Sequence, residues 1–118
     1  MLEITMPRGD IRLVRFQVYD LQTRDVSQVD FSEIYMSVKK SLDEKDVLFQ
    51  KKLTDGGIEK LGIGDYQLRI EPADTDNLVF NKTYPFDIEL IFENEVKQTE
   101  YGELTLTPEV TWTRNEVN

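Results

Sequence analysis

The sequence predicts an all-β protein, an antiparallel β-sandwich of about eight or nine short strands. Runs of alternating apolar and polar residues recur about every ten residues, separated by turn signals such as Thr54-Asp55-Gly56-Gly57. No apolar repeat keeps a helical period for more than one turn. A small barrel formed by the same strands is the alternative architecture. The length of 118 residues predicts one domain, which we expect to cover residues 1–112 and to end in a frayed tail at 113–118.

The alternation also predicts where each strand lies. The expected strands are residues 2–6, 11–18, 34–39, 47–53, 58–61, 66–70, 84–92, 96–100 and 102–107. In the second of these, the apolar phase slips between Leu13 and Phe16, which predicts a β-bulge that returns Phe16 and Val18 to the core. Residues 20–33 predict a loop with a short extended piece, and Asn94-Glu95 predicts the last hairpin turn.

Cysteine and histidine are both absent from the chain. Their absence excludes a Cys/His zinc site, a Ser-His or Cys-His nucleophile and a near-neutral histidine base. Asp87 and Glu89 share one face of a strand with about 7 Å between their Cα atoms, on the side expected to face solvent. That spacing alone does not indicate the paired carboxylates of a glycosidase. We therefore expect no enzymatic activity and no cofactor.

The net charge of −9 is concentrated in the second half of the chain. Residues 1–60 hold ten basic and eleven acidic side chains, whereas residues 61–118 hold four basic and twelve acidic ones. Such a surface repels phosphate backbones, so we expect no nucleic-acid binding. It serves either solubility or head-to-tail contact with a more basic face of a neighbour. No apolar run approaches the roughly 20 residues of a membrane helix and no signal peptide is visible, so we expect cytosolic synthesis.

Two short motifs have both a structural and a functional interpretation. Arg8-Gly9-Asp10 spells the integrin-binding tripeptide, but a tight turn between two strands explains Gly9 better. The acidic corner, Asp74-Thr75-Asp76, offers oxygen ligands for Ca²⁺ but lacks the D-x-D-x-D-G loop with a distal glutamate. The favoured interpretation is a one-turn helical corner in which Asp74 caps free N–H groups.

A structural corner is predicted where the acidic corner meets the longest alternating strand. Pro72 ends the preceding strand because it cannot donate to the ladder, and Leu78 closes the end of the core. Tyr84 and Phe86 begin the next strand. Immunoglobulin-type sandwiches place a tyrosine at this corner, two residues before a core position that Phe86 would occupy here. We therefore expect the Tyr84 hydroxyl to bond the backbone near Asp74 or Asp76.

Several segments together resemble one known family. They are Ile4, Gly9-Asp10, Val38-Lys39-Lys40-Ser41-Leu42-Asp43, Val47-Leu48-Phe49, Gly64-Asp65-Tyr66, Glu71-Pro72-Ala73-Asp74-Thr75 with Leu78, Tyr84-Pro85-Phe86-Asp87-Ile88-Glu89-Leu90, Gly102-Glu103-Leu104-Thr105-Leu106 and Pro108-Glu109-Val110-Thr111. This set resembles the immunoglobulin-like domain of phage and prophage structural proteins of Gram-positive bacteria, as at the N-terminus of baseplate upper proteins. The sequence departs from the family at Val29-Asp30-Phe31-Ser32, which replaces a small Leu-Thr-Gly turn.

The resemblance covers residues 2 to 111 and implies a fold more than a task, because its matched positions are turn glycines, the corner and strand residues. It implies a virion component in the particle or the host cytoplasm, with other virion proteins and copies of itself as partners and with no catalytic or ligand residue. Residues 2–6 and 110–113 are the edges expected to add to a partner sheet.

Three aromatic side chains are candidates for contacts with a partner: Tyr35, Tyr101 and Trp112. Val110 and Trp112 are expected to extend an edge strand, and each of the three aromatics is equally suited to closing the end of the core. An alternative function, a carbohydrate- or cell-surface-binding sandwich used in adhesion, needs these aromatics aligned on one exposed face. A membrane partner is not expected.

Overall fold

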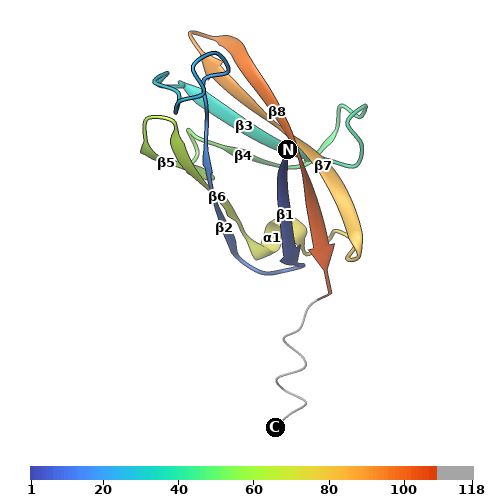
Figure 1. The fold of residues 1–118 in the computed structure, drawn as a ribbon. Coiled ribbons are helices and arrows are strands. Elements are labelled where there is room, and N and C mark those ends of the chain that lie inside the picture. Colours follow the sequence, from blue (N-terminus) through green and yellow to red (C-terminus); the bar gives the residue numbers. More distant parts are fainter. Residues whose placement is uncertain (109–118) are drawn as a thin grey trace.

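The computed structural model describes residues 1–108, which form two β-sheets packed face to face and one short helix (Figure 1). The elements are β1 (Leu2–Pro7), β2 (Arg12–Gln17), β3 (Glu33–Lys39), β4 (Val47–Lys52), β5 (Ile58–Gly62), β6 (Asp65–Ile70), α1 (Pro72–Thr75), β7 (Lys82–Phe92) and β8 (Glu95–Thr107). The predicted all-β sandwich is confirmed. No helix among the described residues is both long and apolar enough to span a bilayer.

The order of the strands is that of an immunoglobulin-type sandwich. One sheet has the order β1-β8-β7-β3-β4 and the other β2-β6-β5, so that the strands fall into the two groups typical of that architecture. Among the described strands, the pairs are antiparallel except that β1 runs parallel to β8. This parallel pair lies at the edge of the larger sheet, where the first strand joins β8.

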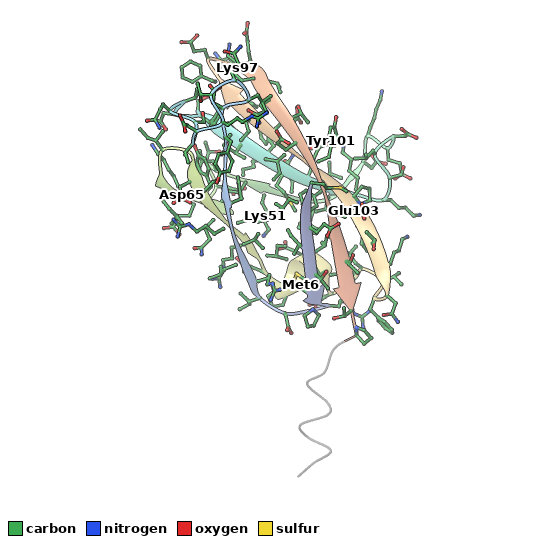
Figure 2. All side chains as sticks on the ribbon, in the orientation of Figure 1. Met6, Lys51, Asp65, Lys97, Tyr101 and Glu103 are labelled. Carbon is green, nitrogen blue, oxygen red and sulfur yellow. The ribbon has the colours of Figure 1, made fainter. Side chains whose placement is uncertain are left out.

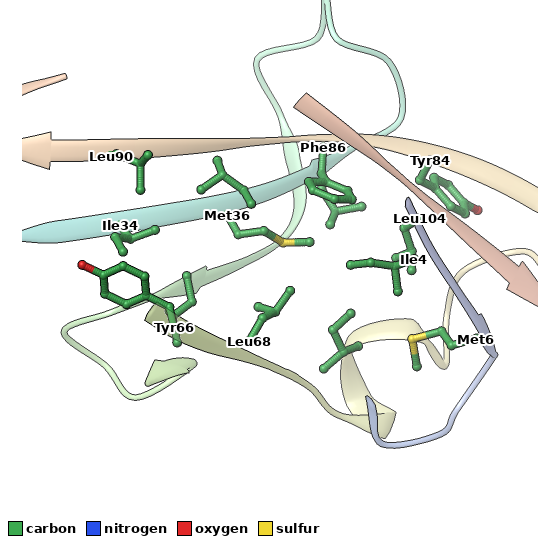
Figure 3. Close-up of a cluster of buried hydrophobic side chains, with 14 of the residues drawn as sticks. Ile4, Met6, Ile34, Met36, Tyr66, Leu68, Tyr84, Phe86, Leu90 and Leu104 are labelled. Atoms are coloured by element: carbon green, nitrogen blue, oxygen red, sulfur yellow. The ribbon is translucent and has the colours of Figure 1, made fainter. Parts of the chain in front are cut away.

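The core lies between the two sheets and is built from alternate residues of each strand. On β7, Tyr84, Phe86, Ile88 and Leu90 point inward and are almost completely buried. Figure 3 shows Ile34, Met36 and Phe86 of the larger sheet facing Tyr66 and Leu68 of the smaller one. Other fully buried members include Met6, Val38, Ile58, Ile70, Leu104 and Leu106. Burying each large apolar side chain stabilises the fold by roughly 1.5–3 kcal/mol.

Strand β2 differs from the prediction. Its register with β6 is continuous from Arg12 to Gln17, so the expected β-bulge is absent from this pair. Val14 and Phe16 point toward the core, whereas Leu13 is half exposed on the outer face. Pairing with β6 decides which alternate residues of β2 face the core, because Val14 lies opposite the buried Leu68 of β6.

The last hairpin also differs in detail. The two strands expected at 96–100 and 102–107 form one strand, β8, in which Gly102 stays in the ladder opposite Phe86. The turn lies one residue earlier than predicted, at Glu93 and Asn94, which have positive φ values of 53° and 64°. Two such residues form the type I′ turn whose twist matches that of a hairpin. The expected strand extension at Val110 and Trp112, and the tail at 113–118, lie outside the described residues.

Candidate functional site

The predicted corner is present between β6 and β7, with one difference in its hydrogen bonding. Pro72 is the first residue of α1, Leu78 packs against the core, and Tyr84 and Phe86 are buried on β7. The Tyr84 hydroxyl accepts a hydrogen bond of 2.9 Å from the backbone N–H of Val79. The expected partners near Asp74 or Asp76 were therefore wrong, because the chain turns after α1 and brings the backbone at residue 79 over the ring.

Asp74 has protein partners for its carboxylate. Its Oδ2 accepts a hydrogen bond of 2.7 Å from the backbone N–H of Glu71 and lies 2.6 Å from Nζ of Lys51. Asp74 thus bonds the residue before the helix, as the glutamate of a capping box does. Lys51 comes from the edge strand β4 and points inward, a placement that discourages edge-to-edge pairing. Within residues 1–108, no three acidic, histidine or cysteine side chains gather as a metal site.

The Arg8-Gly9-Asp10 motif forms the turn between β1 and β2 and ties it to the corner. Gly9 has a φ of 83°, and its N–H donates to Oγ1 of Thr75 at 2.8 Å. The Arg8 guanidinium donates to the Leu78 carbonyl at 3.2 Å and lies 5.0 Å from the centre of the Phe80 ring. The Asp10 N–H donates to the Pro7 carbonyl at 3.4 Å. All three residues therefore have contacts within the fold, which supports the structural interpretation of the motif.

The outer face of the five-stranded sheet carries the two carboxylates and two of the candidate aromatics. Tyr101 lies opposite Asp87, and Tyr35 lies opposite Glu89, on the strands to either side of β7. Nζ of Lys39 lies 3.4 Å from Oδ2 of Asp87, whose other oxygen is buried without a hydrogen-bond partner in the part of the chain described.

The three candidate aromatics differ in their availability. Tyr101 is 54% exposed where β8 passes the start of β1 (Figure 2). Tyr35 is half buried, and Nζ of Lys52 lies 5.7 Å from the centre of its ring. Trp112 lies outside the described residues. Only Tyr101 of the described pair therefore offers a large exposed ring.

Among the strands of residues 1–108, the longest unpaired edge is the first half of β8. Strand β8 lies between β1 and β7, but β1 pairs only with its second half, Gly102–Thr107. On the side away from β7, residues 95–101 therefore have no neighbouring strand within the described chain (Figure 1). The edge expected at residues 2–6 is the outermost strand β1, but its Thr5 carbonyl already accepts a hydrogen bond of 3.0 Å from the Arg12 guanidinium. The sequence predicts a strand at residues 96–100 but does not show whether its neighbour extends far enough to cover it.

An apolar groove of about 240 Å³ adjoins this edge. Its floor is formed by apolar residues of both sheets and of the segment after β2, and two polar residues of the edge strand line its rim: Phe16, Val18, Ile88 and Leu90, with Gln98 and Glu100. The exposed side chains of Met1 and Leu21 also line it. The groove exists because the three-stranded sheet is narrower than the five-stranded one and leaves this end of the hairpin uncovered. Nε2 of Gln98 donates to Oε1 of Glu100 at 2.6 Å. This groove could not be predicted from the sequence, because the residues that line it are far apart in the chain.

Comparison with known proteins leaves the family open. No protein-family model matches the chain, and no curated protein matches it either. The resemblance to phage structural proteins therefore stays a prediction from the quoted motifs.

Proposed function

We propose that this chain is a non-enzymatic structural component of a phage or prophage particle, in its tail, baseplate or head, and that it acts there as a protein–protein interaction module. The sequence motifs support the assignment to a phage particle, because they resemble those of immunoglobulin-like domains in phage structural proteins. The unpaired edge at residues 95–101 supports the interaction, and it is the observation that carries the proposal.

A free strand edge beside a groove has a defined way of binding a partner. Its unpaired N–H and C=O groups pair with an extended segment, and the groove accepts the side chains that point toward it. Each such backbone hydrogen bond contributes about 0.5–1.5 kcal/mol. Affinity then comes from the backbone and selectivity from the groove, and no reacting group is required.

The partners that fit this proposal are other proteins of the particle and further copies of the chain. Symmetric particles bring many copies of one chain together, so weak self-association is sufficient. The net charge of −9 disfavours nucleic acid as a partner. The chain would be made in the cytoplasm of the host bacterium and assembled into the particle there.

The test is the protein content of purified particles. Phage particles induced from the source strain and banded on a density gradient should contain this chain in a fixed ratio to the major capsid protein, as measured by quantitative mass spectrometry. Host cytosolic proteins in the same fraction serve as the control for contamination. A ratio no higher than that of those host proteins would contradict the proposal.

An adhesion module that binds carbohydrate is the second candidate. The observation in its favour is that Tyr35 and Tyr101 lie on the same outer face of the larger sheet. The Lys52 ammonium near the Tyr35 ring counts against it, because a stacked sugar would displace that contact. A glycan array probed with the protein and with Tyr101→Ala decides the matter: adhesion requires a glycan signal that the variant loses.

A further inference from the structure

We propose that the free half of β8 and its groove bind an extended peptide segment that carries a lysine or arginine, whose charge meets Glu100. This inference rests on the proposed interaction function and specifies its ligand. It follows from the direction of the backbone groups, the lining of the groove and the local charge.

The backbone N–H and C=O groups of Thr99 point away from β7, toward the unpaired side of β8. The carbonyl of Thr107 accepts a hydrogen bond from Arg8 on the β1 side, whereas that of Leu106 accepts one from Asn81 on the β7 side. Backbone groups of successive residues point to opposite sides of a strand. By this alternation Thr99 presents its N–H and C=O on the same side as Thr107, beyond the end of β1. An added strand would find both groups available.

The groove matches the two parts of a long basic side chain. Its floor, which includes Phe16 and Ile88, is apolar and suits an aliphatic stem. Glu100 lies opposite Ile88, an inward position, and lines the rim. Its Oε1 accepts a hydrogen bond from Gln98, and no cation pairs with it in residues 1–108. A lysine or arginine on the added strand would supply that missing cation.

The charge around the edge selects a basic segment over a second copy of the chain. Residues 87–101 contain five carboxylates and one lysine: Asp87, Glu89, Glu93, Glu95, Glu100 and Lys97. Two copies paired through this edge would bring two such clusters together, and like charges across paired strands are destabilising. A basic segment instead meets a net negative charge along the edge. Lys97 and Lys39 pair with two of the five carboxylates, Glu95 and Asp87, and the others have no such partner in residues 1–108.

The binding test uses two synthetic heptapeptides, which are as long as the free edge. One is acetyl-Thr-Lys-Val-Lys-Val-Lys-Thr-amide, and the other has glutamate at each lysine. We expect the lysine peptide to shift the backbone amide resonances of Thr99 and Tyr101 in ¹⁵N-labelled protein, and to bind several-fold more weakly in 0.5 M NaCl because salt screens the charges. The glutamate peptide should leave these resonances unchanged. Equal binding of both peptides, or shifts confined to other strands, would overturn the proposal.

Two variants separate the backbone and charge contributions. Thr99→Pro removes the outward N–H at an edge position where proline is tolerated, and it should abolish peptide binding. Glu100→Gln should weaken binding about tenfold through loss of the charged partner. Glu3→Gln, an exposed change on β1, is the matched control and should bind as the unmodified chain does. If Thr99→Pro does not fold, the comparison of Glu100→Gln with Glu3→Gln still decides the proposal.

Self-association at the same edge is a distinct outcome. Amide hydrogen exchange and sedimentation velocity on the peptide-free protein measure it directly. A dimer in which the Thr99 amide is protected would show that the occupant is a second copy and would overturn the peptide proposal. Particle mass spectrometry is independent of this result, so a missing peptide site and a missing particle role are distinguishable.

Discussion

The ring of Phe86 on β7 covers the backbone of Gly102 on β8, directly opposite it in the ladder. A Cβ built on Gly102 would lie 2.2 Å from Cζ of Phe86 and 2.5 Å from the carbonyl oxygen of Leu2. Because one of these atoms is backbone and the ring is fully buried, neither neighbour has room to move. We expect Gly102→Ala to lower the free energy of unfolding by about 2–3 kcal/mol, measured by urea denaturation.

Gly62→Ala is the matched control for this prediction. Gly62 lies on β5, and a Cβ built there meets nothing within 4 Å. Its substitution should leave the unfolding midpoint nearly unchanged. If both variants unfolded alike, the close approach of Phe86 to Gly102 would not be what requires glycine.

Tyr84→Phe tests the corner hydrogen bond. The change removes the hydroxyl that accepts the Val79 N–H and leaves the buried ring in place. We expect the free energy of unfolding to fall by about 1–2 kcal/mol, because the partly buried N–H loses its acceptor. Tyr101→Phe alters an exposed ring and should have no measurable effect. An unchanged melting temperature in Tyr84→Phe would show that the hydroxyl does not stabilise the corner.

Tyr66→Phe should stabilise the protein, whereas Tyr84→Phe should destabilise it. The Tyr66 hydroxyl is buried in the core without a hydrogen-bond partner among the described residues. Its removal is expected to raise the free energy of unfolding by about 1 kcal/mol, and the stacking of the ring on Phe16 is retained. A loss of 1 kcal/mol or more would mean that the hydroxyl has a partner in solution, such as a buried water.

Tyr66 also predicts the behaviour of the protein at high pH. Burial raises the pKa of this hydroxyl above its ordinary value of 10.0, and the charge of Asp30 adds to the shift, although the charge of Lys60 opposes it. A raised pKa means that the folded state holds the proton more tightly than the unfolded state does. The contribution to stability is therefore complete below pH 10 and is lost as the pH rises through the folded pKa. Urea denaturation between pH 9 and pH 11 should show this loss in the unmodified chain and a smaller one in Tyr66→Phe.

Glu33 predicts the behaviour at low pH. Burial favours its neutral form, but hydrogen bonds from the Thr54 hydroxyl and from the N–H groups of Ile34, Thr54 and Leu53 outweigh burial and lower its pKa below 4.5. Stability from this carboxylate is thus complete above pH 4.5 and is lost as the pH falls through the folded pKa. Carboxyl ¹³C NMR should show the lowered pKa, and Thr54→Val should move it back upward. A Glu33 pKa at or above 4.5 in the unmodified chain would contradict the assigned contacts.

Strands with a single apolar phase could be predicted from the sequence, and β2 could not. In β7 only one set of alternate residues, from Tyr84 to Leu90, is apolar throughout, so it had to face the core. In β2, Leu13 offers one phase and Val14 with Phe16 the other, and pairing with β6 decides between them. The sequence predicts a bulge because local periodicity does not identify the strand that pairs with β2.

The sequence by itself determined the fold class, the corner at Pro72 and the chemistry that is excluded by the absence of histidine and cysteine. These properties depend on residues that are neighbours in the chain, or on composition alone. Only the tertiary structure decided that Val79 bonds Tyr84, that Lys51 reaches Asp74 and that β1 leaves half of β8 unpaired. Such contacts depend on how far each strand extends beside its neighbour and on the unequal widths of the two sheets. Local periodicity does not record these lengths, and so the free edge and its groove became visible only in the folded chain.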